Sequence, residues 1–143
     1  MDDKKFKLDI IAPDRILYKG RVQSFSAPGE NGAFQVLYNH APLLSSLVPG
    51  EMKFTLDQGT TVYYATSGGF VEVRDNRVLA LVDTAEKAED IDVQRAQESR
   101  KRAIERLKSR KADIDAERAH QSLARAINRL RVAGRVRETD TVA

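Results

Sequence analysis

The residues that interrupt regular structure are confined to one part of the chain. All four prolines and seven of the eight glycines lie before residue 70, and Gly134 is the one later exception. Proline and glycine mark turns and strand ends, so they predict many short strands in the first part of the chain. The later part has almost no such interruption and can form long helices. The sequence therefore predicts two halves of different structural class.

Alternating residues indicate strands in the first half. Phe6, Leu8 and Ile10 alternate with charged residues, and the same period recurs over residues 51–56 and 71–73. A period of two buries one face of a strand and leaves the other in water. Seven or more strands of this kind fit the first half, which is typical of an antiparallel β-sandwich or barrel.

Turn-forming residues also give the positions of the expected turns. Asp75-Asn76 predicts a tight hairpin, whereas residues 28–32 and 57–59 predict further turns. Gly68-Gly69 indicates a bulge or a sharp strand bend, because no phosphate-loop motif follows it. The apolar run over residues 78–82 predicts a central strand that is buried on both faces.

From Asp92 onward the apolar residues recur at helical spacing. One stripe runs over residues 93–107 and a second over 116–130, so two amphipathic helices are predicted. Asp92 and the segment 113–115 suit their N-caps, and Gly134 is the expected C-terminal stop. The short connection predicts an antiparallel helical hairpin.

These patterns divide the chain into four segments. We expect a β-sandwich over 1–84, a linker over 85–91, a helical hairpin over 92–134 and a flexible tail over 135–143. Alanine dominates the facing helical stripes, which permits close packing but buries little area at about 25 cal/mol per Å². The hairpin is therefore expected to be weakly held and able to open or relocate.

Composition restricts the chemistry of the chain. There is no cysteine and there are only two histidines, so disulfides and thiolate metal sites are excluded and no metal site is expected. The sequence contains no nucleophile or metalloprotease motif, which predicts a non-catalytic protein. No apolar run reaches the roughly 18 residues of a membrane span, and no signal peptide is expected.

Basic residues collect in the predicted hairpin. From residue 92 onward there are 14 basic and eight acidic residues, a net charge of +6, whereas residues 1–91 carry a net charge of −3. This charge leaves open a stand-alone binding module whose hairpin binds nucleic acid or an acidic protein. Binding that weakens strongly with salt and requires no partner subunit would distinguish such a module.

The hairpin arginines have a geometry that suits an anion. In an antiparallel pair that folds near residue 113, Arg95 lies level with about residue 131, so Arg129 and Arg131 are its neighbours. Arg125 and Arg129 are four residues apart and share a face. Up to three guanidinium groups could converge on a phosphate, with Asp92 and Glu86 accepting from a ribose or a base. The alternative is that these arginines are solvated or bind carboxylates of a partner.

Six stretches, in this order, resemble the epsilon subunit of the bacterial F-type (rotary, proton-translocating) ATP synthase. They are LDIIAP (8–13), NHAPLL (39–44), SGGFVEV (67–73), AEKA (85–88), IDVQRA (91–96) and RAINRL (125–130). The resemblance implies a β + α fold with an antiparallel β-sandwich of about ten strands, followed by an antiparallel α-helical hairpin.

The resemblance also implies a function. It implies a non-catalytic subunit of the central stalk, which contacts the gamma subunit and the c-ring through its sandwich. The hairpin would extend to the alpha and beta subunits of the catalytic head and oppose ATP hydrolysis. The chain would contact the bacterial inner membrane only through the complex, on the cytoplasmic side, and would bind no nucleic acid.

The resemblance further implies a regulatory ligand and contact residues. No cofactor or metal is required, and ATP is the expected ligand of the folded hairpin. The residues implied for ATP are Glu86, Ile91, Asp92, Arg95, Ala96, Arg125 and Arg129. Those implied for contact with gamma or the c-ring are Asn39, His40, Ala41 and Pro42.

The loop at residues 39–42 also has features of its own. His40 is expected to be a turn residue hydrogen-bonded to the backbone. Many family members have glycine at the position of Asn39, and residues 34–37 also depart from the common pattern. These departures concern the conformation of the loop.

Overall fold

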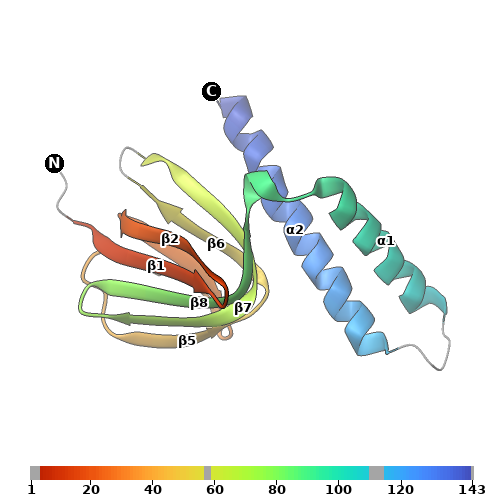
Figure 1. Ribbon diagram of the computed structural model, residues 1–143, viewed down its shortest axis with the longest axis horizontal. Helices are drawn as coiled ribbons and strands as arrows, with labels where there is room; N and C mark the ends of the chain where they lie inside the picture. Colours follow the sequence, from red (N-terminus) through yellow and green to blue (C-terminus); the bar gives the residue numbers. More distant parts are fainter. Residues whose placement is uncertain (1–3, 57–58, 110–114, 143) are drawn as a thin grey trace. The chain divides into compact units, whose positions relative to one another are not determined.

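The computed structural model describes residues 4–56, 59–109 and 115–142, with side chains as far as residue 136. The chain forms two compact units, Met1–Lys87 and Ala88–Ala143. Strands fill the first unit and helices the second (Figure 1). The expected linker at 85–91 is therefore largely structured, because its first residues belong to the last strand and the next ones form a 3-10 helix.

The elements follow the predicted change from strands to helices. The first unit contains β1 (Phe6–Ala12), β2 (Arg15–Val22), β3 (Ser24–Gly29), β4 (Gly32–Val36), β5 (Leu43–Leu47), β6 (Gly50–Thr55), β7 (Thr61–Arg74) and β8 (Arg77–Lys87). The second contains the 3-10 helix η2 (Ala88–Asp90), α1 (Val93–Ser109) and α2 (Ala116–Val142).

The described strands form one continuous sheet that folds over a core. Its order is β2-β1-β8-β7-β5-β3-β4, and β6 pairs with both β3 and β7. Eight strands are present in the described residues, fewer than the expected ten, because β7 and β8 are 14 and 11 residues long and remain unbroken through a bend. The pairing is antiparallel except between β1 and β8, which run parallel.

The alternating residues of the first unit build its core. Eighteen buried residues form one cluster, and all of them precede residue 86. Phe6, Leu8 and Ile10 are at most 1% exposed, and Phe25 and Phe54 close the core from β3 and β6. Since each buried phenylalanine removes a large apolar area from water, this unit has a self-contained core.

The β8 strand is buried on one face only. Val78, Ala80 and Val82 point into the core, but Leu81 is 48% exposed. The expectation of a strand buried on both faces was wrong, since an apolar run does not show whether a second layer covers its outer side.

The expected turns and bulge are present where the structure describes them. Asp75 and Asn76 have φ angles of 53° and 57°, the left-handed pair that a two-residue hairpin turn requires. The expected turn at 28–32 is shorter, because β3 and β4 pair as far as Gly29 and Gly32. The turn at 57–59 lies partly outside the described residues.

The bulge at Gly68 and Gly69 bends the longest hairpin. The register between β7 and β8 shifts at both glycines. The Thr66 hydroxyl donates to Thr84 O at 3.0 Å and accepts from Gly68 N at 3.1 Å. This buried threonine therefore satisfies a backbone group that the irregular ladder leaves unpaired.

The two helices begin at the expected caps. Asp92 Oδ1 accepts from Arg95 N at 3.0 Å, and Asp115 Oδ1 accepts from Arg118 N at 3.2 Å. The remaining candidates for the second cap, residues 113 and 114, lie outside the described residues. Both contacts are the side-chain-to-backbone bonds of an N-cap, which satisfy amides at the helix start.

The end of the hairpin differs from the sequence expectation. The α2 helix continues through Gly134 to Val142, across the segment expected to be a tail. A glycine in a helix costs only about 1 kcal/mol relative to alanine, so the flanking helix formers override it. Ile127, expected on the inner stripe, is 47% exposed.

No helix in the described part of the chain is long and apolar enough to span a membrane.

Candidate functional site

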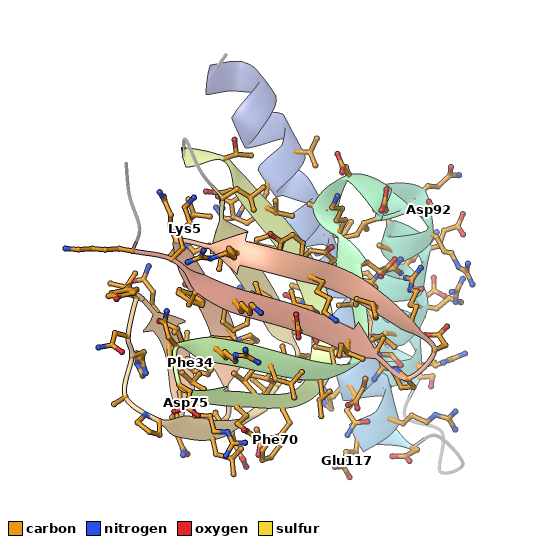
Figure 2. The ribbon with its side chains drawn as sticks, turned by 60° about the vertical axis from the view of Figure 1, so that its left-hand side comes forward. Lys5, Phe34, Phe70, Asp75, Asp92 and Glu117 are labelled. Atoms are coloured by element: carbon orange, nitrogen blue, oxygen red, sulfur yellow. The ribbon has the colours of Figure 1, made fainter. Side chains whose placement is uncertain are left out.

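The start of α1 contains four of the residues implied for ATP. Ile91 is buried, and Asp92 caps the helix through Arg95 N as described above. Ala96 is fully buried and donates its amide to Asp92 O at 3.0 Å. Arg95 is exposed. One carboxylate oxygen of Asp92 therefore caps the helix, and the Asp92 residue is exposed at the helix start (Figure 2).

The middle of α2 contains the two remaining arginines of that set. Arg125 is exposed, and its guanidinium donates to Ser122 Oγ at 3.2 Å. Arg129 is half-buried one turn further along the helix. Arginines four residues apart lie on the same helix face, so both can approach one ligand.

The boundary between the two units divides the predicted set. Ile91, Asp92, Arg95, Ala96, Arg125 and Arg129 all belong to the second unit. Glu86 belongs to β8 of the first unit, where it pairs with Ala65 of β7. The hairpin unit therefore holds the cationic residues and the capping carboxylate, and the sheet holds the second carboxylate.

Asn128 is a buried polar residue of α2 that the sequence did not predict to have a role. Asn128 is only 7% exposed, and its Oδ1 accepts from the Arg131 guanidinium at 3.1 Å. Asparagine is a poor helix former, so its presence in a helix interior could have indicated a special position. It accepts a hydrogen bond that holds the side chain of Arg131 one turn further along the helix.

The loop between β4 and β5 contains the predicted contact residues. Asn39 has a φ of 58°, a conformation that glycine adopts most readily, which explains why glycine is common there. His40 Nδ1 donates to Ala41 O at 2.6 Å, so the expected turn role of His40 is confirmed. Ala41 and Pro42 are exposed.

A side chain from a distant turn holds this loop. Asn39 N donates to Asn76 Oδ1 at 2.7 Å, and Asn76 Nδ2 donates to Lys5 O at 2.9 Å. Asn76 thus connects the loop, the β7–β8 turn and the start of β1. The sequence predicts a turn at Asn76, but it does not show that Asn76 supports the predicted contact loop, because 37 residues separate the two asparagines.

Comparison with known families assigns both units. The family model of the ATP synthase delta/epsilon chain β-sandwich domain matches residues 5–88. The family model of the delta/epsilon chain long α-helix domain matches residues 89–134. The chain belongs to the ATP synthase delta/epsilon family. The resemblance found in the sequence is confirmed, and the family assignment favours a subunit over a stand-alone binding module.

Curated relatives of the delta/epsilon family are epsilon chains. The chain is 47% identical over 107 residues to the ATP synthase epsilon chain of Pelotomaculum thermopropionicum, covering 75% of this chain and 79% of the relative. It is 42% identical over 104 residues to that of Koribacter versatilis, covering 73% and 72%.

Solved structures share the fold of this family member. A chain of the Euglena gracilis mitochondrial ATP synthase, from a structure of OSCP, F1 and c-ring, matches with a TM-score of 0.79 and 20% identity, covering 90% of this chain and 81% of that one. A chain from the central stalk and c-ring of the Tetrahymena thermophila enzyme matches with a TM-score of 0.59 and 15% identity, covering 95% and 98%.

The sandwich of this delta/epsilon chain exposes large apolar side chains. Leu44 on β5 is 64% exposed, Phe70 on β7 is 41% exposed and Leu81 on β8 is 48% exposed. Phe70 and Leu81 are direct cross-strand partners, and Phe70 projects outward from the sheet (Figure 2). Several adjacent apolar side chains on an outer face are a feature of protein contact surfaces.

The support of the contact loop by Asn76 can be tested within one turn. Asn76→Gly keeps a residue that tolerates a positive φ but removes both side-chain hydrogen bonds, so the loop around Asn39 should loosen while the turn itself persists. We expect amide hydrogen exchange at residues 38–41 to rise about fivefold, since one net hydrogen bond is worth about 1 kcal/mol.

Asp75→Gly is the matched control for this test. It changes the other positive-φ residue of the same turn, whereas the side-chain hydrogen bond to the loop comes from Asn76. Its amide exchange rates at residues 38–41 should match those of the parent chain. Equal acceleration in both variants would show that the turn, and not the Asn76 side chain, holds the loop.

Proposed function

We propose that this chain is the non-catalytic epsilon subunit of the rotor in a bacterial F-type ATP synthase. The two family models, which together match 130 residues, support this function. Its sandwich would bind the gamma subunit and the c-ring, and would reach the cytoplasmic side of the inner membrane only through the complex. The exposed side chains of Leu44, Phe70 and Leu81 and the loop at 39–42 support this contact.

The hairpin is proposed to regulate ATP hydrolysis by changing position. The observation that carries this proposal is the small size of the buried side chains of α1, which are only Ala96 and Ala103 in a helix of 17 residues. A buried leucine stabilises by about 1.5–3 kcal/mol, and alanine by much less. The helix can therefore leave its partner at modest cost and extend to the alpha and beta subunits of the catalytic head.

ATP is proposed as the ligand that holds the hairpin folded. Arg95, Arg125 and Arg129 would bind the phosphates, while Ile91, Asp92 and Ala96 would lie toward the base and ribose. A ligand that binds only the folded hairpin stabilises it by about 2.7 kcal/mol at one hundred times its dissociation constant. That free energy exceeds what the two buried alanines of α1 contribute, so ATP would withdraw the inhibitory form.

Titration calorimetry with ATP on the full chain tests this site. Arg125→Ala and Arg129→Ala should each weaken binding about tenfold, since a charge-assisted hydrogen bond is worth about 1.5–3 kcal/mol. Asp92→Asn should weaken ATP binding without unfolding the helix, because asparagine caps as well as aspartate.

Arg102→Ala is the matched control for the arginine variants. Like Arg125, Arg102 is exposed and donates to a serine hydroxyl three residues earlier at 3.2 Å, but it lies on α1 and is not one of the residues predicted for ATP. Its affinity for ATP should equal that of the parent chain. The ATP site would be refuted by no heat of binding at about 1 mM ATP, or by equal affinity in all these proteins.

A further inference from the structure

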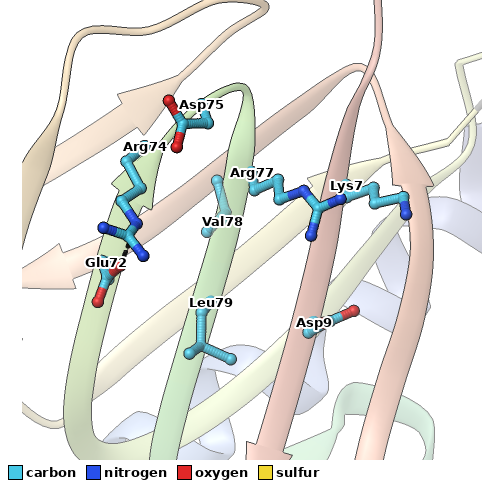
Figure 3. A pocket seen from close by; sticks show the side chains of 8 residues that line it. All are labelled: Lys7, Asp9, Glu72, Arg74, Asp75, Arg77, Val78 and Leu79. Carbon is cyan, nitrogen blue, oxygen red and sulfur yellow. Dashed lines mark ion pairs between the residues drawn. The ribbon is translucent and has the colours of Figure 1, made fainter.

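Four basic residues form a row across the outer face of the sheet. Arg21 of β2 pairs with Lys7 of β1, Lys7 pairs with Arg77 of β8, and Arg77 pairs with Arg74 of β7. All four are exposed, and each has a buried neighbour in its strand, so their side chains lie on the side opposite the core. Figure 3 shows Arg77 extending over β1 beside Lys7.

This row is unfavourable for the sheet itself. Like charges directly opposite one another on neighbouring strands destabilise the pairing. Arg74 is compensated, because its Nε lies 3.0 Å from a carboxylate oxygen of Glu72. In the described part of the chain Arg21, Lys7 and Arg77 form no ion pair. Three adjacent cations therefore remain available to an anionic partner.

The surroundings of the row favour a narrow partner. A hollow of about 600 Å³ is lined by the carboxylates of Asp9, Glu72 and Asp75 as well as by Lys7, Arg74 and Arg77. In a smaller hollow of about 230 Å³, Lys5, Lys7, Arg21 and Arg77 lie around a single carboxylate, that of Asp75. A planar anionic membrane would contact the carboxylates as well as the cations and would be repelled by the carboxylates. A narrow peptide chain can bind along the row of cations alone.

We propose that the row of Arg21, Lys7, Arg77 and Arg74 is a docking site for an acidic protein segment. Glutamate or aspartate side chains would pair with guanidinium groups, which bind carboxylates in a planar, bidentate manner. The row is continuous with the predicted contact loop, because Asn76 lies between Arg74 and Arg77 and holds Asn39. The site belongs entirely to the first unit and is independent of ATP binding by the hairpin.

The test measures binding of a fluorescent peptide of ten glutamates to the full chain in about 0.1 M salt, where the Debye length is about 10 Å. The double variant Lys7→Glu/Arg77→Glu should bind the peptide at least about tenfold more weakly, since juxtaposed like charges oppose association. The control Arg15→Glu/Lys53→Glu changes the net charge equally at two exposed positions of β2 and β6, outside the row. The peptide affinity of this control should fall less than about threefold, because charges outside the row are screened from the bound peptide.

Single substitution separates folding from binding. Lys7→Glu places a carboxylate between Arg21 and Arg77, so its urea midpoint should equal or exceed that of the parent chain while its peptide affinity falls. Equal losses in the row and control variants would overturn the proposal, as would no peptide binding by the parent chain. Binding to phosphatidylserine vesicles but not to the peptide would overturn it in favour of a membrane surface.

Discussion

Gly69→Ala is expected to lower the free energy of unfolding of the first unit by about 3 kcal/mol or more. Gly69 has a φ of 147°, a conformation that an L side chain rarely adopts. A Cβ atom there would lie 2.7 Å from Val82 Cα and would also overlap the Leu81 carbonyl. Both contacts are with atoms of the β8 backbone, so the overlap cannot be relieved by the rotation of a side chain. Urea unfolding followed by circular dichroism measures the loss.

Gly32→Ala separates the steric effect from the backbone effect. Gly32 has a φ of 125°, but a Cβ atom there meets nothing within 4 Å. In this control the free energy of unfolding should fall only by the cost of the unfavourable backbone conformation, about 1–2 kcal/mol. If the two variants lost equal stability, close packing between β7 and β8 at Gly69 would not be the reason that glycine is required.

Local sequence signals located several features of the fold correctly. Asp92 caps α1, Asp75-Asn76 forms a hairpin turn and Gly68-Gly69 forms a bulge. Each of these features depends on a conformational preference of one or two residues, or on a side chain that bonds to its own backbone neighbours. Such preferences act over a few residues, so the sequence alone contains them.

Features that depend on distant partners could not be predicted in the same way. Alternation in β1 shows which of its faces is buried, but it does not show that β8 lies beside it in parallel. The exposure of Leu81 likewise depends on what covers the outer face of β8, and the continuation of α2 past Gly134 depends on its neighbours. Both outcomes are set by the environment of the residue rather than by its identity.

The candidate site shows the same limit. The sequence identified Arg125 and Arg129 by their helical spacing and the loop at 39–42 by its resemblance to a family. It could not identify the contact between Asn76 and the loop, or the row formed by Arg21, Lys7 and Arg77, because the residues involved lie on separate strands and turns. Only the register of the sheet brings their side chains together.

Removal of residues 92–143 is expected to raise ATP hydrolysis by the assembled complex at least about fivefold, the lower range of a coupling free energy of 1–3 kcal/mol. The truncated chain keeps all eight described strands and all 18 residues of the core cluster, so the sandwich should fold and still join the complex. It loses the segment of net charge +6 that is proposed to oppose hydrolysis.

Salt dependence provides a second readout for this truncation. If the charged hairpin acts by attraction to acidic surfaces, inhibition by the full chain should weaken as salt rises, since a Debye length of about 10 Å at 0.1 M shortens to about 3 Å at 1 M. The truncated complex has no hairpin, so its hydrolysis should change less over the same range. Mass spectrometry of the purified complexes must show that each contains one copy of its chain. Equal hydrolysis rates in two such complexes would refute the inhibitory role, and rejection of the truncated chain from the complex would refute the assignment of assembly to the sandwich.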